Sequence, residues 1–204
     1  KSTNTLNDSL AMPDDMVTLS LVASEGLDKP LIEINGDEQN VEGDGDEWTV
    51  ERVFVDGADD GKITFSIFFK DYAHNEGEII SKTTDGSVVA FDGTPPELED
   101  ISLYSNNKFD KSLAVKNDSI FLEFTSTELL RDLKITINGN DVGLYDIDNF
   151  VYKYFHVCTS DDTEGLVPFV IDYKDMAGNQ GEQIIETSDD SNVLFDNTPP
   201  EPFK

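Results

Sequence analysis

The stretch that decides the fold is one that the chain contains twice, first as Lys70-Asp71-Tyr72-Ala73-His74-Asn75-Glu76-Gly77-Glu78. It returns 104 residues later as Lys174-Asp175-Met176-Ala177-Gly178-Asn179-Gln180-Gly181-Glu182. Asp92-Gly93-Thr94-Pro95-Pro96-Glu97 returns at the same spacing, as Asp196-Asn197-Thr198-Pro199-Pro200-Glu201. A period of about 100 residues is the usual size of one domain and is too long for one unit of a solenoid. The sequence therefore predicts two copies of one module, residues 1–94 and 95–204, joined by a short Thr-Pro-Pro linker.

Alternating apolar and polar residues predict β-strands in both copies. Two of these strands run into Asn35-Gly36 and Asn138-Gly139, which is the strongest short signal for a hairpin. The predicted strands are Val17–Val22, Leu31–Ile34, Trp48–Val55, Ile63–Phe69 and Glu78–Thr83, with Ile120–Phe124, Leu133–Ile137, Phe150–Val157, Val167–Tyr173 and Gln183–Thr187 in the second copy. About seven short strands per 100 residues predict an all-β fold with two tandem antiparallel β-sandwich domains. Trp48 and Phe150 are expected to be equivalent aromatic anchors of the two cores.

The charge of the chain limits its partners. Asp and Glu number 43 against 14 Lys and Arg, which gives a formal net charge of −29 at pH 7. Binding to the phosphate backbone of nucleic acids is excluded, and anionic lipid surfaces are disfavoured. Hydrophobic residues at 37% in periodic runs indicate a folded chain rather than disorder. No apolar run reaches the roughly 18 residues that a membrane-spanning segment requires, so we expect no membrane insertion.

The sequence predicts no catalytic site. His74 lies in a turn where the second copy has Gly178, and we expect it to be exposed. His156 lies within an apolar strand, and neither histidine has a serine, cysteine or carboxylate partner at a recognisable spacing. The single cysteine, Cys158, lies in an apolar stretch and is expected in the core. We therefore predict a protein that is not an enzyme.

The order of the motifs resembles the tandem bacterial Ig-like repeats of large secreted or cell-surface proteins, including calcium-stiffened adhesins. A strand is followed by Ser24-Glu25 or Thr127-Glu128, then the Asn-Gly turn, the Asp-to-Asn turn and the closing Phe-Asp-(Gly or Asn)-Thr-Pro-Pro. The resemblance covers nearly the whole chain twice. It implies two Ig-like domains, cut from a longer array, in an extracellular bacterial protein that is secreted or displayed on the cell surface. The implied partners are neighbouring Ig-like repeats of the parent chain, and the fragment itself is expected to be a monomer.

Calcium is the expected cation, because it takes six to eight oxygen ligands and the turns are rich in carboxylates. In an Ig-like sandwich, the loop after the second strand and the last hairpin lie at one end of the domain. The loop Asp56–Gly61 and Asp92 lie at the other end. The ligands expected at the junction of the two copies are Asp59, Asp60, Asp92, Glu97, Glu128, Asp175 and Asn179. The alternative is turn chemistry alone, with Asp bonding its own backbone and Gly or Asn in the left-handed region.

Three functional hypotheses follow from the sequence. The first is a non-catalytic spacer or adhesin module that projects a distal part from a surface, with Ca²⁺ and proline linkers setting its stiffness. The second is a module that binds a glycan or a protein, which exposed aromatics among Tyr104, Phe109, Tyr145 and Phe150 would support. The third is a pair of accessory domains of a secreted enzyme whose catalytic part lies elsewhere.

Overall fold

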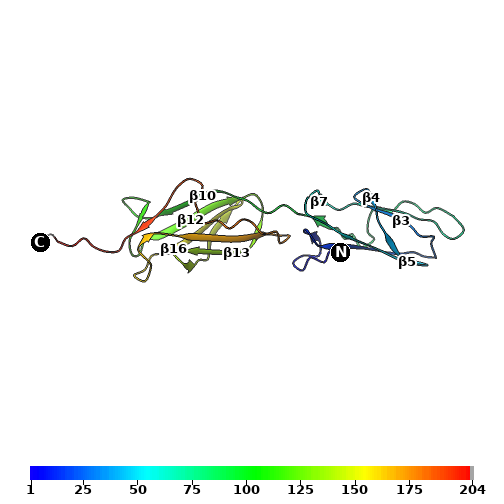
Figure 1. Ribbon diagram of the computed structural model, residues 1–204, viewed down its shortest axis with the longest axis horizontal. Coiled ribbons are helices and arrows are strands. Elements are labelled where there is room, and N and C mark those ends of the chain that lie inside the picture. Colours follow the sequence, from blue (N-terminus) through cyan, green and yellow to red (C-terminus); the bar gives the residue numbers. More distant parts are fainter. Residues whose placement is uncertain (203–204) are drawn as a thin grey trace. The chain divides into compact units, whose positions relative to one another are not determined.

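A computed structural model of the chain describes residues 1–202, so positions 203 and 204 of the second predicted domain lie outside the described residues. All regular elements in this range are strands (Figure 1). Nothing helical in residues 1–202 is long and apolar enough to cross a membrane. The chain divides into two compact units, Lys1–Thr94 and Pro95–Lys204, each with its own hydrophobic core. The predicted all-β fold with two tandem β-sandwich domains is confirmed.

Unit 1 is built from two three-stranded antiparallel sheets whose inner faces share a core that includes Ile32, Val50 and Phe91. The first sheet has the order β2-β6-β5, and the second has the order β4-β3-β8. A short third ladder, β1-β9-β7, pairs β1 in parallel with β9. The strands are β1 (Leu10–Ala11), β2 (Met16–Val22), β3 (Leu31–Ile34), β4 (Asp37–Glu38), β5 (Val41–Asp44), β6 (Glu47–Val53), β7 (Gly61–Lys62), β8 (Phe65–Phe68) and β9 (Ala90–Phe91).

Unit 2 repeats this plan with a larger first sheet, β10-β12-β16-β15, opposite β14-β13-β18. The third ladder, β11-β19-β17, again contains one parallel pair, β11 with β19. Figure 1 shows β10, β12 and β16 with β13 in this unit. The strands are β10 (Leu98–Ser105), β11 (Leu113–Ala114), β12 (Ser119–Ser126), β13 (Leu130–Ile137), β14 (Asn140–Asp141), β15 (Leu144–Asp148), β16 (Val151–Val157), β17 (Gly165–Leu166), β18 (Phe169–Asp175) and β19 (Leu194–Phe195).

The apolar and polar residues that alternate in the predicted strands correspond to buried and partly exposed residues in the structure. In β12, Ile120, Leu122 and Phe124 are fully buried, while the residues between them are only partly covered. Successive side chains of a strand point to opposite faces of its sheet, so one set packs into the core and the other faces outward. This outward set in unit 2 becomes important below.

Both predicted Asn-Gly hairpins are confirmed. Asn35 and Gly36 have φ angles of 50° and 83°, and Asn138 and Gly139 have 51° and 76°. These turns connect β3 to β4 and β13 to β14 in direct antiparallel pairs. Positive φ at both central residues matches the right-handed twist of the flanking strands, which is why Asn-Gly is favoured there.

The prediction that Phe150 anchors the core of unit 2 is wrong. Trp48 is buried in unit 1, but Phe150 is 42% exposed. Asn149 and Phe150 form the two-residue turn between β15 and β16, both with positive φ, and Asp148 pairs with Val151 across that turn. The buried residue that corresponds to Trp48 is Tyr152, 104 residues later. The turn therefore removes Phe150 from the sheet.

The predicted strands Glu78–Thr83 and Gln183–Thr187 do not form either. Each makes one isolated bridge, Ile67 with Ile80 and Ile171 with Ile184. The N–H of Gly77 also donates to Phe69 O, so Glu78 and Ile79 together lie opposite Phe68 alone, and the resulting bulge interrupts the ladder. Gly77 lies so close to the ring of Phe69 that a Cβ would collide with it, which explains the glycine at this place in the motif.

Cys158 is buried in unit 2, as predicted, and it provides a probe of that unit alone. Burial, with the nearby charges of Asp162 and Asp118, raises the pKa of its thiol to about 11. We expect a disulfide reagent such as DTNB at about pH 8 to leave the native protein unmodified, because the thiolate is the reacting species. In denaturant the thiol should react fully. Rapid stoichiometric labelling of the native chain would contradict this placement.

Candidate functional site

The repeated Asp-to-Asn turns are held by their own side chains. In unit 1, Asp71 Oδ1 accepts a hydrogen bond from Asn75 N at 2.8 Å, and Asp71 Oδ2 accepts one from Asn75 Nδ2 at 2.7 Å. In unit 2, Asp175 accepts the same two bonds from Asn179, at 2.9 Å and 2.7 Å, and a third from Gly178 N at 2.6 Å. The turn chemistry considered from the sequence is therefore present in both copies.

The left-handed position of this turn is filled differently in the two units. Gly178 has a φ of 110°, and His74 has a φ of 65°. His74 is largely exposed, as predicted, and its Nδ1 lies 3.2 Å from Asp28 Oδ2. The hydrogen bonds from Asn75 hold the pKa of Asp71 below its usual value. Each turn is thus a compact carboxylate–amide unit.

The seven predicted metal ligands divide between the two units, with Asp59, Asp60 and Asp92 in unit 1 and Glu97, Glu128, Asp175 and Asn179 in unit 2. In unit 2, Glu128 and Asp175 each offer a carboxylate oxygen, and these two oxygens lie within 4.8 Å of one another. The backbone of Glu97 pairs with that of Thr127, which places Glu97 at the same end. These residues could supply part of the oxygen set that Ca²⁺ requires.

Asp60 has a role in unit 1 that the sequence prediction missed. Its Oδ1 accepts a hydrogen bond from Gly93 N at 2.6 Å, and its Oδ2 accepts one from Thr94 Oγ1 at 2.5 Å. These are the last residues before Pro95. The carboxylate therefore binds the beginning of the Thr-Pro-Pro segment to the body of unit 1.

Unit 2 repeats this contact with Glu164. Its Oε1 accepts hydrogen bonds from Asn197 N and Thr198 Oγ1, both at 2.9 Å. Glu164 lies 104 residues after Asp60, and each is followed by a glycine with positive φ, Gly61 or Gly165. The 104-residue spacing of the repeat thus identifies Glu164 as the counterpart of Asp60. We call the pairs Asp60–Thr94 and Glu164–Thr198 the linker clamps.

His156 has a carboxylate partner at a spacing that was not recognised from the sequence. Its Nε2 lies 2.9 Å from Asp162 Oδ2, and the two side chains are only 12% and 3% exposed. Asp162 also accepts hydrogen bonds from Thr159 N at 2.6 Å and Asn140 Nδ2 at 3.0 Å. The partner was missed because a six-residue spacing across a loop matches no local motif. The pair joins β16 to the following loop.

The pH dependence of unit 2 should report this pair. Burial opposes ionisation of Asp162, but the hydrogen bonds from Thr159 and His156 outweigh it, so the pKa of Asp162 lies below its usual value near 3.8. A lowered carboxyl pKa stabilises the fold above the unfolded value, and this contribution is lost as the pH falls. We expect Asp162→Asn to destabilise unit 2 by about 1–3 kcal/mol near pH 6, and by less near pH 3. Urea unfolding of the parent and the variant, followed by circular dichroism at both pH values, measures this difference, and a difference that grows towards low pH would contradict it.

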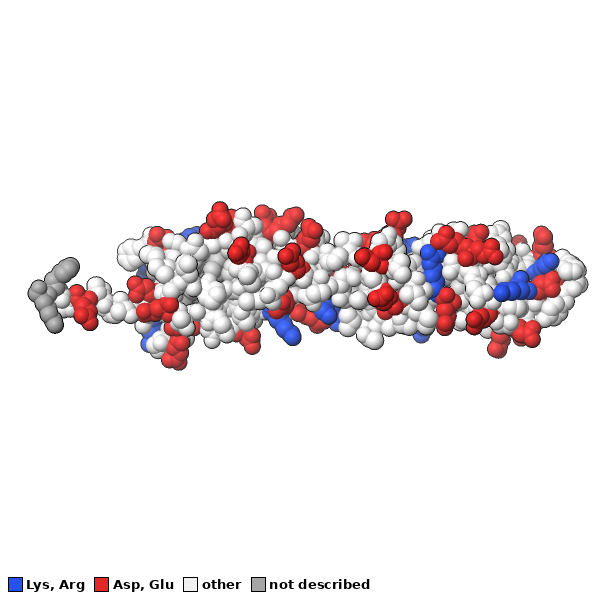
Figure 2. Space-filling view, in the orientation of Figure 1, with Lys and Arg blue, Asp and Glu red and all other residues white. Residues whose placement is uncertain are grey.

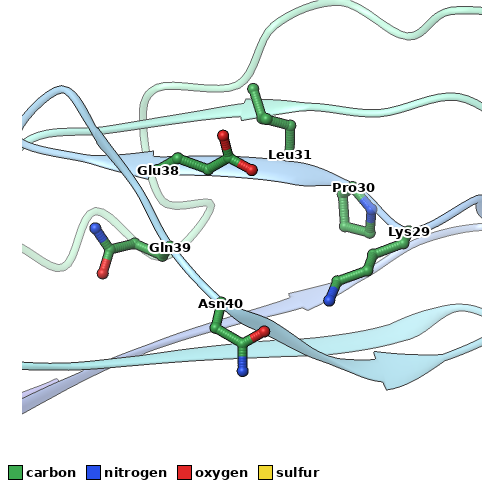
Figure 3. A pocket seen from close by; sticks show the side chains of 6 residues that line it. All are labelled: Lys29, Pro30, Leu31, Glu38, Gln39 and Asn40. Carbon is green, nitrogen blue, oxygen red and sulfur yellow. The ribbon is translucent and has the colours of Figure 1, made fainter.

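Unit 1 also has a depression of about 460 Å³ beside β3 (Figure 3). Figure 3 shows Lys29, Pro30 and Leu31 at the beginning of β3, with Glu38, Gln39 and Asn40 on the segment from β4 towards β5. Its lining mixes a cation, an anion and two amides with apolar groups. This mixture does not gather the oxygen ligands that Ca²⁺ requires.

No protein-family model and no curated protein matches this chain. Among solved structures it is similar to the fibronectin(III)-like modules of CbhA from Clostridium thermocellum, with 11% identity, a TM-score of 0.41, and coverage of 100% of this chain and 97% of that one. It is also similar to the Ig tandem domains of titin, with 8% identity, a TM-score of 0.31 and 93% of each chain covered. A third is the protein SGBP-B of Bacteroides ovatus, solved in complex with a mixed-linkage heptasaccharide, with 15% identity and a TM-score of 0.27. That likeness covers 96% of this chain but 45% of the other.

These similarities concern the fold. The strand topology described above defines the class of the protein by itself: a tandem of two Ig-like β-sandwich domains.

Proposed function

We propose that the chain is a non-catalytic spacer module of an extracellular bacterial protein, secreted or displayed on the cell surface. In this function the two Ig-like units, with neighbouring repeats of the parent chain, hold a distal part of that protein away from its base. The observation that carries the proposal is the linker clamp, because both units contain it at the same place. A spacer needs its connections to be stiff, and the clamps act on these connections.

The clamps support stiffness through simple chemistry. A carboxylate that binds both a backbone N–H and the threonine hydroxyl removes freedom from the chain just before the prolines. The two prolines then restrict φ and favour an extended conformation. The direction in which the chain leaves each unit is thus tied to that unit rather than left to a flexible loop.

Calcium is the finer part of the proposal. Asp and Glu are spread over the visible face of both units and outnumber Lys and Arg there (Figure 2), as they do in the sequence by 43 to 14. Such a surface repels itself, and a divalent cation would reduce that repulsion. The proposed ligands are the seven predicted residues, and in unit 2 Glu128 and Asp175 each have a carboxylate oxygen within 4.8 Å of the other. Asp60 and Asp175 already accept hydrogen bonds, so each would bind the cation with its remaining lone pairs.

Breaking the clamp of unit 1 should loosen the connection without unfolding either unit. We expect Asp60→Ala and Thr94→Val to broaden the pair-distance distribution in small-angle X-ray scattering, measured in EDTA so that no cation contributes. Asp59→Ala, which removes the exposed neighbouring carboxylate, is the matched control and should leave the distribution unchanged. Identical scattering from all four proteins would remove the clamp as support for a spacer.

Calcium binding is tested separately by thermal unfolding in EDTA, in Ca²⁺ and in Mg²⁺. A ligand at about 100 times its dissociation constant stabilises a protein by about 2.7 kcal/mol, which is a shift of several degrees for domains of this size. We expect this shift with Ca²⁺ alone, and expect Asp175→Ala to reduce it. Asp71→Ala removes the equivalent turn carboxylate outside the predicted ligand set, and should keep the shift. Equal melting temperatures in EDTA and Ca²⁺ would remove calcium from the proposal. The spacer function would then be tested by the scattering experiment alone.

A further inference from the structure

The outer face of the larger sheet of unit 2 carries aromatic side chains that cross all four strands. Tyr104 in β10 lies directly opposite Phe121 in β12, and Phe121 lies opposite Phe155 in β16. Tyr145 in β15 completes the line, with its ring centroid 5.2 Å from that of Phe155. We call these four residues the aromatic row.

The aromatic row lies outside the core. The neighbours of Phe121 in the strand, Ile120 and Leu122, are fully buried, so Phe121 points to the opposite face of the sheet. Tyr145 is 59% exposed, and the other three rings are partly covered by one another and by nearby lysines. Tyr145 therefore offers most of its ring to solvent, and the other three rings continue the row as partly exposed aromatic groups.

Polar groups flank the row and are held in place by it. Glu123 lies directly opposite Lys153 in the next line of cross-strand pairs. Lys153 Nζ lies 3.2 Å from Glu123 Oε2 and 5.0 Å from the ring centroid of Phe121. The hydroxyl of Tyr104 donates to Glu123 Oε2 at 3.0 Å. Glu123 and Lys153 thus place charged hydrogen-bonding groups beside the aromatic row.

The corresponding sheet of unit 1 has three strands, and its central cross-strand pair lacks these aromatic side chains. Where unit 2 pairs Phe121 with Phe155, unit 1 pairs Thr18 with Glu51. The Ig-like fold of this chain therefore forms without an aromatic row. Its presence in unit 2 calls for another explanation, and binding is the usual reason for exposed aromatic side chains gathered in one place.

We propose that the aromatic row binds a neutral polysaccharide chain. A sugar ring has an apolar C–H face that packs on aromatic rings and hydroxyl groups at its edges that would bond to groups such as Glu123 and Lys153. Four strands about 4.8 Å apart make the row about 14 Å long, which suits a short run of sugar rings rather than a single one. The net charge of −29 disfavours anionic polymers, so a neutral glycan fits the electrostatics.

The exposed area argues against a protein partner or a second copy of this chain. An aromatic side chain offers about 150–250 Å² in total, and three of these four are partly covered, so the row exposes roughly 300 Å². A stable protein interface needs about 800 Å² from each partner. The row is narrow, and charged side chains flank it, so it suits a slender ligand.

Affinity electrophoresis in native gels, with the whole chain, tests the proposal. The gels contain a soluble xylan, a soluble β-glucan or a soluble mannan, and calorimetry then measures the affinity for the polysaccharide that retards the protein. We expect at least one of them to retard the parent. Tyr145→Ala should weaken binding by about tenfold or more, the usual effect of truncating an aromatic hot-spot residue. Tyr145→Phe keeps the ring and should retain most of the affinity.

Phe109→Ala is the matched control, because Phe109 is an aromatic residue of the same unit that is 96% exposed outside the row. It should bind as the parent does. Protection of Cys158 in each variant shows that unit 2 is folded. Migration unchanged by all three polysaccharides would overturn the proposal, as would an equal loss of binding in Phe109→Ala. Sedimentation that shows a dimer of the parent but not of Tyr145→Ala would also overturn it and assign the row to a second copy.

Discussion

Aspartate side chains that accept hydrogen bonds from nearby N–H and hydroxyl groups hold the loops of both units, and the strands depend on these loops for their connections. Asp71 and Asp175 close the repeated turn, and Asp162 ties His156 to the loop after β16. Hydrogen bonds from Ser87 and Ser112 likewise hold the pKa values of Asp85 and Asp110 below their usual range. Hydrogen-bond donors stabilise the ionised form of a carboxyl group, which is why these two pKa values are lowered. Part of the acidity of this chain is therefore structural.

The same chemistry acts where the chain leaves each unit. The linker clamps apply one carboxylate to a backbone N–H and to a threonine hydroxyl, in two copies that differ between Asp60 and Glu164. The longer glutamate side chain makes the same contacts, so the geometry is retained although the residue is different. This agreement between the copies is the observation that supports the proposed spacer function. The surplus of negative charge remains, and a divalent cation is the simplest way to reduce its repulsion.

The two units have the same fold but different surface chemistry. Their cores use corresponding residues, as Trp48 and Tyr152 show, whereas their outward faces carry different chemistry. Thr18 and Glu51 make an ordinary polar face in unit 1, and the corresponding pair in unit 2 is part of the aromatic row. A module that only separates its neighbours has no need of such a row. A spacer that also holds a neutral polysaccharide would use both properties along one chain.

The sequence by itself determined the tandem repeat, the all-β class and the Asn-Gly hairpins. The repeat is visible as recurring motifs, the strands as apolar and polar residues in alternation, and the hairpins as residues that tolerate positive φ. The Asp-to-Asn turns belong to the same group, since donor and acceptor are four residues apart. Only the tertiary structure decided that Phe150 leaves the sheet, that a bulge interrupts the pairing after Gly77, and that His156 binds Asp162. It alone also placed Asp60 on Thr94, 34 residues away, and aligned four aromatic residues from four strands. These features depend on strand register and on contacts between distant segments, and a slip of one residue would turn the aromatic row towards the core.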